Sequence, residues 1–185
     1  MASIQELRER LDGLAEIEEP LERRLRTLAI ITECLAPTGI KPVLVGGMAV
    51  EFYTSGGYST FDIDVIADTQ SLGRALDDLG FSRHGRHWFR EDLSVAIEAP
   101  SDSLGAEAER IAEVKMGDLR FYVLGVEDLI LDRLNAYVHW KSDEDRRWAT
   151  HLIAENRDQI DWDYLNRRAE EDGVRGPLDE IVGQI

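Results

Sequence analysis

The segment from residue 43 to residue 68 constrains the fold of this chain more than any other. It opens with the apolar run Val43–Val45, which predicts a short strand and ends at Gly46 and Gly47. The residues that follow suit a helix, so the sequence predicts a strand, a glycine turn and a helix. Glycine lets the backbone approach a ligand closely, and the free N–H groups at a helix start favour an anion such as phosphate.

Acidic and apolar residues alternate at positions 61–66. This period of two predicts a strand with Asp62 and Asp64 on one face and Ile63 and Val65 on the other. Two like charges on one face repel unless solvent or a cation lies beside them. A tight turn and an exposed acidic strand would each be ordinary alone, but together they predict a divalent cation beside a phosphate cradle.

This order of motifs resembles the DNA polymerase β-like nucleotidyltransferase superfamily in its minimal bacterial and archaeal form. The matching residues are Gly46-Gly47 and the run Thr60-Phe61-Asp62-Ile63-Asp64-Val65. The family also has a third carboxylate on a later strand, and Glu98 stands in such an apolar setting within residues 93–99. The resemblance implies an α/β fold of the α+β kind, with a mixed β-sheet flanked by helices and with helical extensions at both ends.

The resemblance also implies roles for these residues. Asp62, Asp64 and Glu98 would be catalytic and would hold Mg²⁺ or Mn²⁺, with an NTP as substrate. Gly46, Gly47 and Thr60 would bind the nucleotide.

A second similarity lies at residues 125–134 and 141–145. These residues resemble a helix pair of small nucleotidyltransferases related to type IV toxin and abortive-infection proteins, which implies nucleotide-binding roles for Arg133 and Asp143. Those relatives usually carry lysine where this chain has Arg133, and a guanidinium presents a different geometry to phosphate than an ammonium does. As first-turn residues of a helix, Asp143 and Asp145 also have a purely structural explanation.

The chain has 185 residues, of which 43% are hydrophobic, so it can bury a sizeable single core. We expect N-terminal helices at 1–36, a nucleotidyltransferase core at 37–125 and a C-terminal helical region at 126–185, packed as one unit. The expected helices are 3–12, 20–35, 71–79, one from 126, one opening at Ser142 with a capping box to Asp145, and two in the tail broken between Gly173 and Pro177. The later expected strands are 81–84, 87–90, 93–99 and a hairpin within 114–124 that turns at Gly117-Asp118, with a loop over 100–110.

The formal net charge is −16, and lysine is scarce. Such a surface is typical of proteins adapted to high salt, which we state as a hypothesis. It disfavours non-specific nucleic-acid binding, so an RNA acceptor would need a local basic patch. Arg83, Arg86 and Arg90 form the best cationic cluster before Glu98, although they also fit ordinary surface charge. With no apolar run of membrane-spanning length and a charged N-terminus, we expect a cytoplasmic protein without membrane contacts.

Three classes of function fit the sequence. The first is a metal-dependent nucleotidyltransferase that moves NMP from an NTP to an acceptor hydroxyl, on tRNA or a protein for example, and releases pyrophosphate. The second is a non-catalytic relative that binds a nucleotide or a cognate partner protein, as in a toxin–antitoxin pair. The third is a haloacid-dehalogenase-like phosphatase or a metal-dependent glycosyltransferase. The phosphatase would need its Asp-x-Asp after the first strand, and the glycosyltransferase a longer chain.

Overall fold

One mixed sheet of seven strands forms the centre of the computed structural model, counted over the residues that it describes, which are 2–55, 57–58, 60–103 and 110–185. The strands are β1 Val43–Val45, β2 Asp62–Ile66, β3 Ser82–His84, β4 His87–Arg90, β5 Val95–Glu98, β6 Ile111–Met116 and β7 Leu119–Leu124. Their order across the sheet is β3-β4-β5-β2-β1-β7-β6. Strand β1 is antiparallel to β2 and parallel to β7, and β2 is parallel to β5. The predicted α+β class with a mixed sheet is therefore confirmed.

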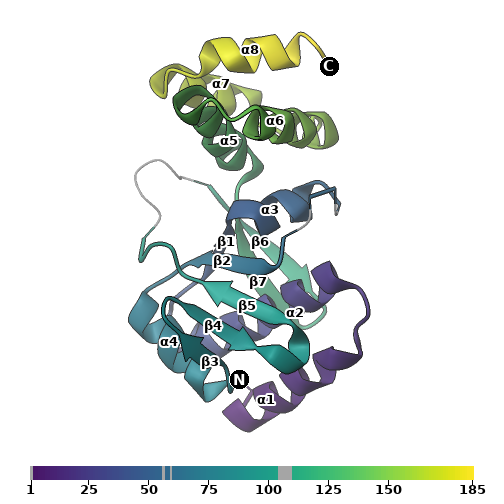
Figure 1. Ribbon diagram of the computed structural model, residues 1–185, viewed down its shortest axis with the longest axis vertical. Helices are drawn as coiled ribbons and strands as arrows, with labels where there is room; N and C mark the ends of the chain where they lie inside the picture. Colours follow the sequence, from purple (N-terminus) through teal and green to yellow (C-terminus); the bar gives the residue numbers. More distant parts are fainter. Residues whose placement is uncertain (1, 56, 59, 104–109) are drawn as a thin grey trace.

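Helices lie on the sheet and at one end of the molecule. They are α1 Ile4–Asp12, α2 Pro20–Leu35, α3 Gly46–Tyr53, α4 Thr69–Asp78, α5 Val126–Trp140, α6 Asp143–Asn156, α7 Trp162–Glu171 and α8 Arg175–Val182. Figure 1 shows α5 to α8 gathered beyond one end of the sheet, with α3 between them and the strands. Helix α3 contacts β1, β2, α5 and α6, so it links the sheet to the helical end.

The alternation in β2 separates a core face from an acidic face, as predicted. Ile63 and Val65 are buried and belong to the same apolar cluster as Leu28 and Ile31 of α2. The intervening positions of β2 are half-buried. Helices α2 and α4 contact each other, and α2 also packs on β7. The carboxylates of β2 therefore project away from this core.

Two predicted strands are shorter than expected. The strand at 61–66 begins at Asp62, because Phe61 lies in a bend and is 83% exposed. The strand at 93–99 covers only Val95–Glu98, because a short 3₁₀ turn precedes it and Ser94 has a positive φ of 51°.

Other boundaries also shift. The helix predicted at 71–79 spans Thr69–Asp78, because the side chain of Asp68 caps it by accepting a hydrogen bond from the Ser71 N–H. The helix predicted after the glycine pair begins at Gly46 itself and has eight residues. The predicted break in the tail ends before Pro177, which lies in the first turn of α8, where a helix has no use for the missing N–H. Most of the predicted loop at 100–110 lies outside the described residues.

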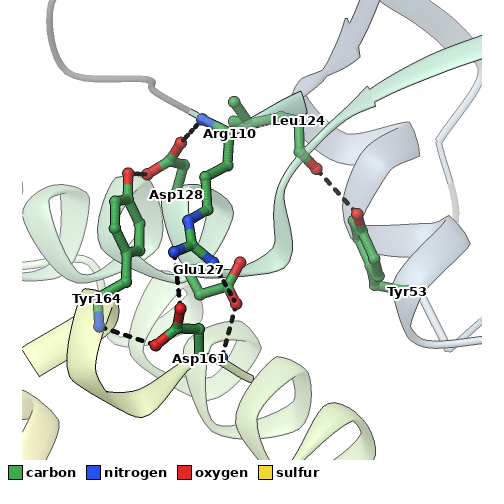
Figure 2. Close-up of polar contacts among 7 residues, drawn as sticks. All are labelled: Tyr53, Arg110, Leu124, Glu127, Asp128, Asp161 and Tyr164. Carbon is green, nitrogen blue, oxygen red and sulfur yellow. Dashed lines mark hydrogen bonds and ion pairs between the residues drawn. The ribbon is translucent and has the colours of Figure 1, made fainter. Parts of the chain in front are cut away.

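Arg110 ties the sheet to the helical end (Figure 2). Its guanidinium forms an ion pair of 2.7 Å with Asp161, lies 3.7 Å from Glu127 and sits over the ring of Tyr164. Its backbone N–H donates to Asp128, which also accepts from the Tyr164 hydroxyl. This cluster joins the chain before β6 to α5 and α7, so it fixes how α5 lies over the sheet.

A buried ion pair fixes α3. The Arg24 guanidinium of α2 binds both carboxylate oxygens of Glu51 on α3 at 2.8 Å, and each residue is 6% exposed. Arg24 also donates to the Thr60 carbonyl at 2.6 Å, just before β2. One guanidinium therefore holds both α3 and the start of the acidic strand.

We expect Glu51→Leu to lower the free energy of unfolding by about 3–5 kcal/mol, because it leaves the Arg24 charge buried without its partner. The double variant Arg24→Met with Glu51→Leu should lose less, since no buried charge remains. Urea unfolding followed by circular dichroism measures both. Asp179→Ala, which breaks an exposed pair with Arg175, serves as control and should cost at most about 1 kcal/mol. Equal losses for Glu51→Leu and the control would contradict this account.

Candidate active site

One row of residues crosses the sheet at the centre of the site. Asp64 on β2 pairs with Val45 on β1 on one side and with Glu98 on β5 on the other. Glu98 in turn pairs with His87 on β4. Asp62 lies two residues before Asp64 on the same face, opposite Ala96 rather than another acid. The three carboxylates thus share one face of neighbouring strands.

Gly46 lies directly against Asp64. It has a φ of +65°, and a Cβ atom at this position would overlap Oδ2 of the Asp64 carboxylate. Both facts favour glycine, because other residues rarely adopt such a backbone and a Cβ atom here would force the Asp64 side chain to move. The glycine turn and the acidic strand are therefore in contact, which sequence spacing alone could not establish.

Gly47 faces an aromatic residue that the sequence analysis did not single out. A Cβ atom here would lie 2.8 Å from the Tyr58 ring and 3.4 Å from Cβ of Thr60. Tyr58 also packs edge-on against Trp148 of α6, with ring centroids 4.8 Å apart. Tyr58 and Trp148 form a wall beside the turn that no motif signals, because the contact joins segments far apart in the chain. A larger residue at position 47 would therefore first meet Tyr58.

Asp64 is held in an unfavourable electrostatic setting. Burial raises the pKa of its carboxyl group, and the negative charges of Glu98 and Asp62 raise it further. His87 and Arg133 oppose this rise. The influence of Arg133 shows that α5 brings a cation toward the acidic face.

Glu98 already has two basic partners. Its Oε2 lies 2.9 Å from His87 Nε2, and its Oε1 lies 3.1 Å from Arg86 Nε. Arg86 is thus the one member of the predicted cationic cluster that reaches a carboxylate of the site. Arg83 lies over the ring of Trp88 instead. Arg90 binds Asp12, Asp92 and the Leu79 carbonyl.

The side chains of the row are not arranged as a ready metal centre. Within the described part of the chain, no three histidine, cysteine, aspartate or glutamate side chains form a group that could hold a metal ion. The donor chemistry nevertheless fits a hard divalent cation, because Asp62, Asp64 and Glu98 offer only oxygen atoms. A cation would also relieve the repulsion that raises the pKa of Asp64.

Arg133 and Asp143, both predicted to bind nucleotide, lie in different settings. Arg133 is mostly buried and pairs with Asp132 at 2.6 Å and with Asp145 at 2.9 Å. Asp143 is the exposed first residue of α6, whose cap is the Ser142 hydroxyl accepting from the Asp145 N–H. Of the three acidic residues at 143–145, Asp145 is therefore the one that contacts Arg133.

A cavity of about 760 Å³ opens beside the row. Gly46 and Ile66 line it together with Arg133 and other residues of α5, and Asp172 after α7 also belongs to its lining. The sequence analysis did not predict it, because its walls come from three regions that only the fold brings together. Its volume is that of a small-molecule site.

A helix that starts at a glycine pair beside carboxylates on a mixed sheet defines the class of nucleotidyltransferase-like proteins. The model of a family described as nucleotidyltransferase of unknown function (DUF6036) matches residues 24–180. The chain belongs to this family. A search of curated proteins finds no match.

Across the described residues, every helix is too short or too polar to cross a membrane.

We expect Gly46→Ala to destabilise the protein more than Gly39→Ala does. Both positions have positive φ, which costs roughly 1–2 kcal/mol for alanine. Space at Gly39 is open, whereas at Gly46 the new methyl group overlaps Asp64. The difference in the free energy of unfolding, measured in urea, therefore reports the contact with Asp64. Equal losses would mean that this contact is absent in solution.

Asp64→Asn should stabilise the protein at pH 7 when no ligand is present. Because the pKa of Asp64 is raised in the folded state, its ionised form costs stability above that pKa. As the pH falls, the Asp64 carboxyl group becomes protonated in the folded protein before it does so in the unfolded chain. The gain in the free energy of unfolding from Asp64→Asn should therefore shrink as the pH falls through the raised pKa. Urea unfolding at several pH values measures it, with the exposed Asp158→Asn as the matched control. Destabilisation by Asp64→Asn at pH 7 would contradict this account.

Proposed function

We propose that this chain is a metal-dependent nucleotidyltransferase that moves NMP from an NTP to an acceptor hydroxyl and releases pyrophosphate. Membership of the family supports the general activity. The single observation that carries the proposal is the row in which Gly46 lies against Asp64 and Asp64 pairs with Glu98. This row, with Asp62 two residues before Asp64, brings three carboxylates beside the glycine turn that we propose as the phosphate cradle.

Gly46 and Gly47 would bind the triphosphate through backbone N–H groups. The N-cap residue of α3 is Val45, whose side chain has no polar atom with which to cap the helix. The first N–H groups of the helix are therefore open to an anion, and the helix dipole favours one there. Thr60 is close to Gly47 and is the candidate for a further contact with the nucleotide.

Asp62, Asp64 and Glu98 would hold Mg²⁺ or Mn²⁺. Bound there, the ion would neutralise charge on the triphosphate and favour attack at the α-phosphorus. Asp62 and Asp64 face the site, and no described residue forms a hydrogen bond with either carboxylate. Glu98 would have to exchange Arg86 and His87 for the ion. Once freed, the exposed Arg86 could pair with a phosphate oxygen.

Arg133 would add positive charge near the triphosphate. It already shares its guanidinium between Asp132 and Asp145, so its position is fixed by two ion pairs. Asp143 is exposed in the free chain, so a contact between it and nucleotide would arise only on binding.

One observation favours a second candidate, a non-catalytic relative that binds a nucleotide or a partner protein, as in a toxin–antitoxin pair. The third carboxylate, Glu98, is engaged by Arg86 and His87 in the free chain. A binding module could keep this contact permanently, whereas an enzyme must break it. The two candidates therefore differ in whether Glu98 is needed for turnover.

The test is transfer of labelled nucleotide from each of the four NTPs, with Mg²⁺ or Mn²⁺, to total tRNA, protein lysate and small hydroxyl compounds. We expect Asp62→Ala, Asp64→Asn and Glu98→Gln each to lower turnover by about a thousandfold or more, because the charge of the ion and the triphosphate is then uncompensated. Circular dichroism should show that each variant keeps its fold.

Asp158→Asn provides the matched control, since this exposed residue lies outside the site and should keep the activity of the natural chain. Transfer that persists in all three site variants would refute the catalytic proposal. Nucleotide binding without any turnover in the natural chain would support the binding module instead.

A further inference from the structure

Strand β6 forms one edge of the sheet. In the order of the strands that the structure describes, β7 lies on one side of β6 and no strand lies on the other. The opposite edge is β3, which has three residues, whereas β6 has six. An edge strand presents a row of backbone N–H and C=O groups that no neighbouring strand binds. The edge at β6 is therefore long enough for the sheet to add a further strand there.

The odd-numbered residues of β6 direct their backbone groups to this open edge. Arg110 precedes β6, and its carbonyl accepts the Gly125 N–H at 2.8 Å, so its backbone faces the side of β7. Because the direction of the backbone groups alternates along a strand, the even-numbered residues of β6 bond to β7 as well. The N–H and C=O groups of the odd-numbered residues thus point away from β7.

Apolar side chains at this edge are incompletely covered. The core face of β6 carries three apolar side chains that are only half-buried, and these are Ala112, Val114 and Met116. Ile111, on the other face, is 46% exposed. A second strand beside β6 would remove part of this apolar surface from water, which favours association.

The hairpin of β6 and β7 is neutral in an otherwise acidic chain. Its residues 111–124 include two acids, Glu113 and Asp118, and two bases, Lys115 and Arg120. The whole chain, by contrast, carries a formal net charge of −16. Two copies that met through acidic surfaces would repel each other, whereas contact through this hairpin brings neutral segments together.

The two charges of β6 complement those of a second β6. When two copies of the strand pair antiparallel about Val114, Glu113 of each copy lies opposite Lys115 of the other. The backbone groups of these two residues point to the open edge, so each opposed couple can exchange its backbone hydrogen bonds. Centring the pair on Glu113 or on Lys115 would instead set like charges opposite each other, which destabilises a sheet. Among these registers, the one about Val114 satisfies both the charges and the backbone.

The existing contacts of Glu113 leave room for such a partner. Within one copy, its carboxylate lies 3.3 Å from Arg120 on β7. Both side chains are exposed, so this pair is weak and the carboxylate can also reach a lysine of a second copy.

Space beneath the joined sheet also allows the pairing. Strands lie about 4.8 Å apart, so β7 and its counterpart in the second copy would be about 14 Å apart. Helix α2, which packs on β7, has a diameter of about 10–12 Å with its side chains, so one such helix from each copy fits there. The two-fold axis runs perpendicular to the sheet, so the candidate sites of both copies would open on the same side.

We propose that this chain forms a symmetric dimer through β6, in which two copies of the strand pair antiparallel about Val114 and join their sheets into one. The partner is a second copy of the chain, because the same strand supplies both members of the complementary charge pair. The dimer does not depend on the proposed nucleotide transfer, since β6 carries none of the residues assigned to that reaction.

Sedimentation equilibrium of the full chain tests the assembly. At about 0.15 M potassium chloride, raising the concentration from about 1 µM to about 200 µM should shift the mass reversibly from that of the 21.0 kDa chain to twice this value. A chain that stays monomeric over this range would overturn the inference.

Charge reversal tests the register. Glu113→Lys sets lysines opposite each other and Lys115→Glu sets glutamates opposite each other, so each variant should raise the Kd of the dimer by about tenfold or more. An equimolar mixture of these two variants should form a mixed dimer, because one strand then carries only positive charges and the other only negative charges. The double variant, which exchanges the two charges, should regain a Kd within about threefold of that of the natural chain.

Asp158→Lys provides the matched control. It makes the same charge change as Glu113→Lys at an exposed position outside β6 and should not raise the Kd of the dimer. Circular dichroism checks that every variant remains folded. A dimer that survives both single reversals, or a double variant that stays monomeric, would place the contact elsewhere and overturn the inference. Equal losses of dimer in Asp158→Lys and Glu113→Lys would overturn it as well.

Discussion

The pairing register at Asp64 is the constraint on which the rest of the site depends. Asp64 is paired with Val45 on one side and Glu98 on the other, so the start of α3 and the third carboxylate meet at one point. A shift of β2 by one residue would turn its carboxylates into the core and Ile63 and Val65 out of it. Burial of these two apolar side chains therefore sets the position of the acids.

Electrostatic anchors then hold the surrounding elements to this register. The buried Arg24–Glu51 pair fixes α3 and, through the Thr60 carbonyl, the chain that enters β2. Arg110 fixes α5 relative to the sheet (Figure 2), and α5 carries Arg133 toward Asp64. The acidic site itself is destabilising, since burial and like charges raise the pKa of Asp64. A cluster of charges that lowers the stability of the free protein in this way is typical of sites that bind a ligand.

Local pattern predicted much of the fold and part of the site. The alternation of β2 revealed which face carries Asp62 and Asp64, and the similar setting of Glu98 indicated its strand, because a period of two depends only on neighbouring residues. The contacts of Glu98 with Arg86 and His87, the Tyr58 wall beside Gly47 and the cavity lined by Gly46 and α5 could not be predicted in this way. They depend on side-chain conformations and on segments that meet only after folding. Asp143 illustrates the limit, because its motif marked the correct helix start while Asp145 makes the contact with Arg133.

Localised binding of Mn²⁺ tests the central claim most directly. Mn²⁺ broadens the NMR signals of nearby amides, so titration into ¹⁵N-labelled full chain maps its position. Potassium chloride at about 0.5 M suppresses diffuse binding to the acidic surface. The account predicts the strongest broadening at Gly46, Gly47 and the amides around Asp64 and Glu98, with loss of this pattern in Asp64→Asn. Broadening spread over the acidic helices, or unchanged in Asp64→Asn, would contradict it.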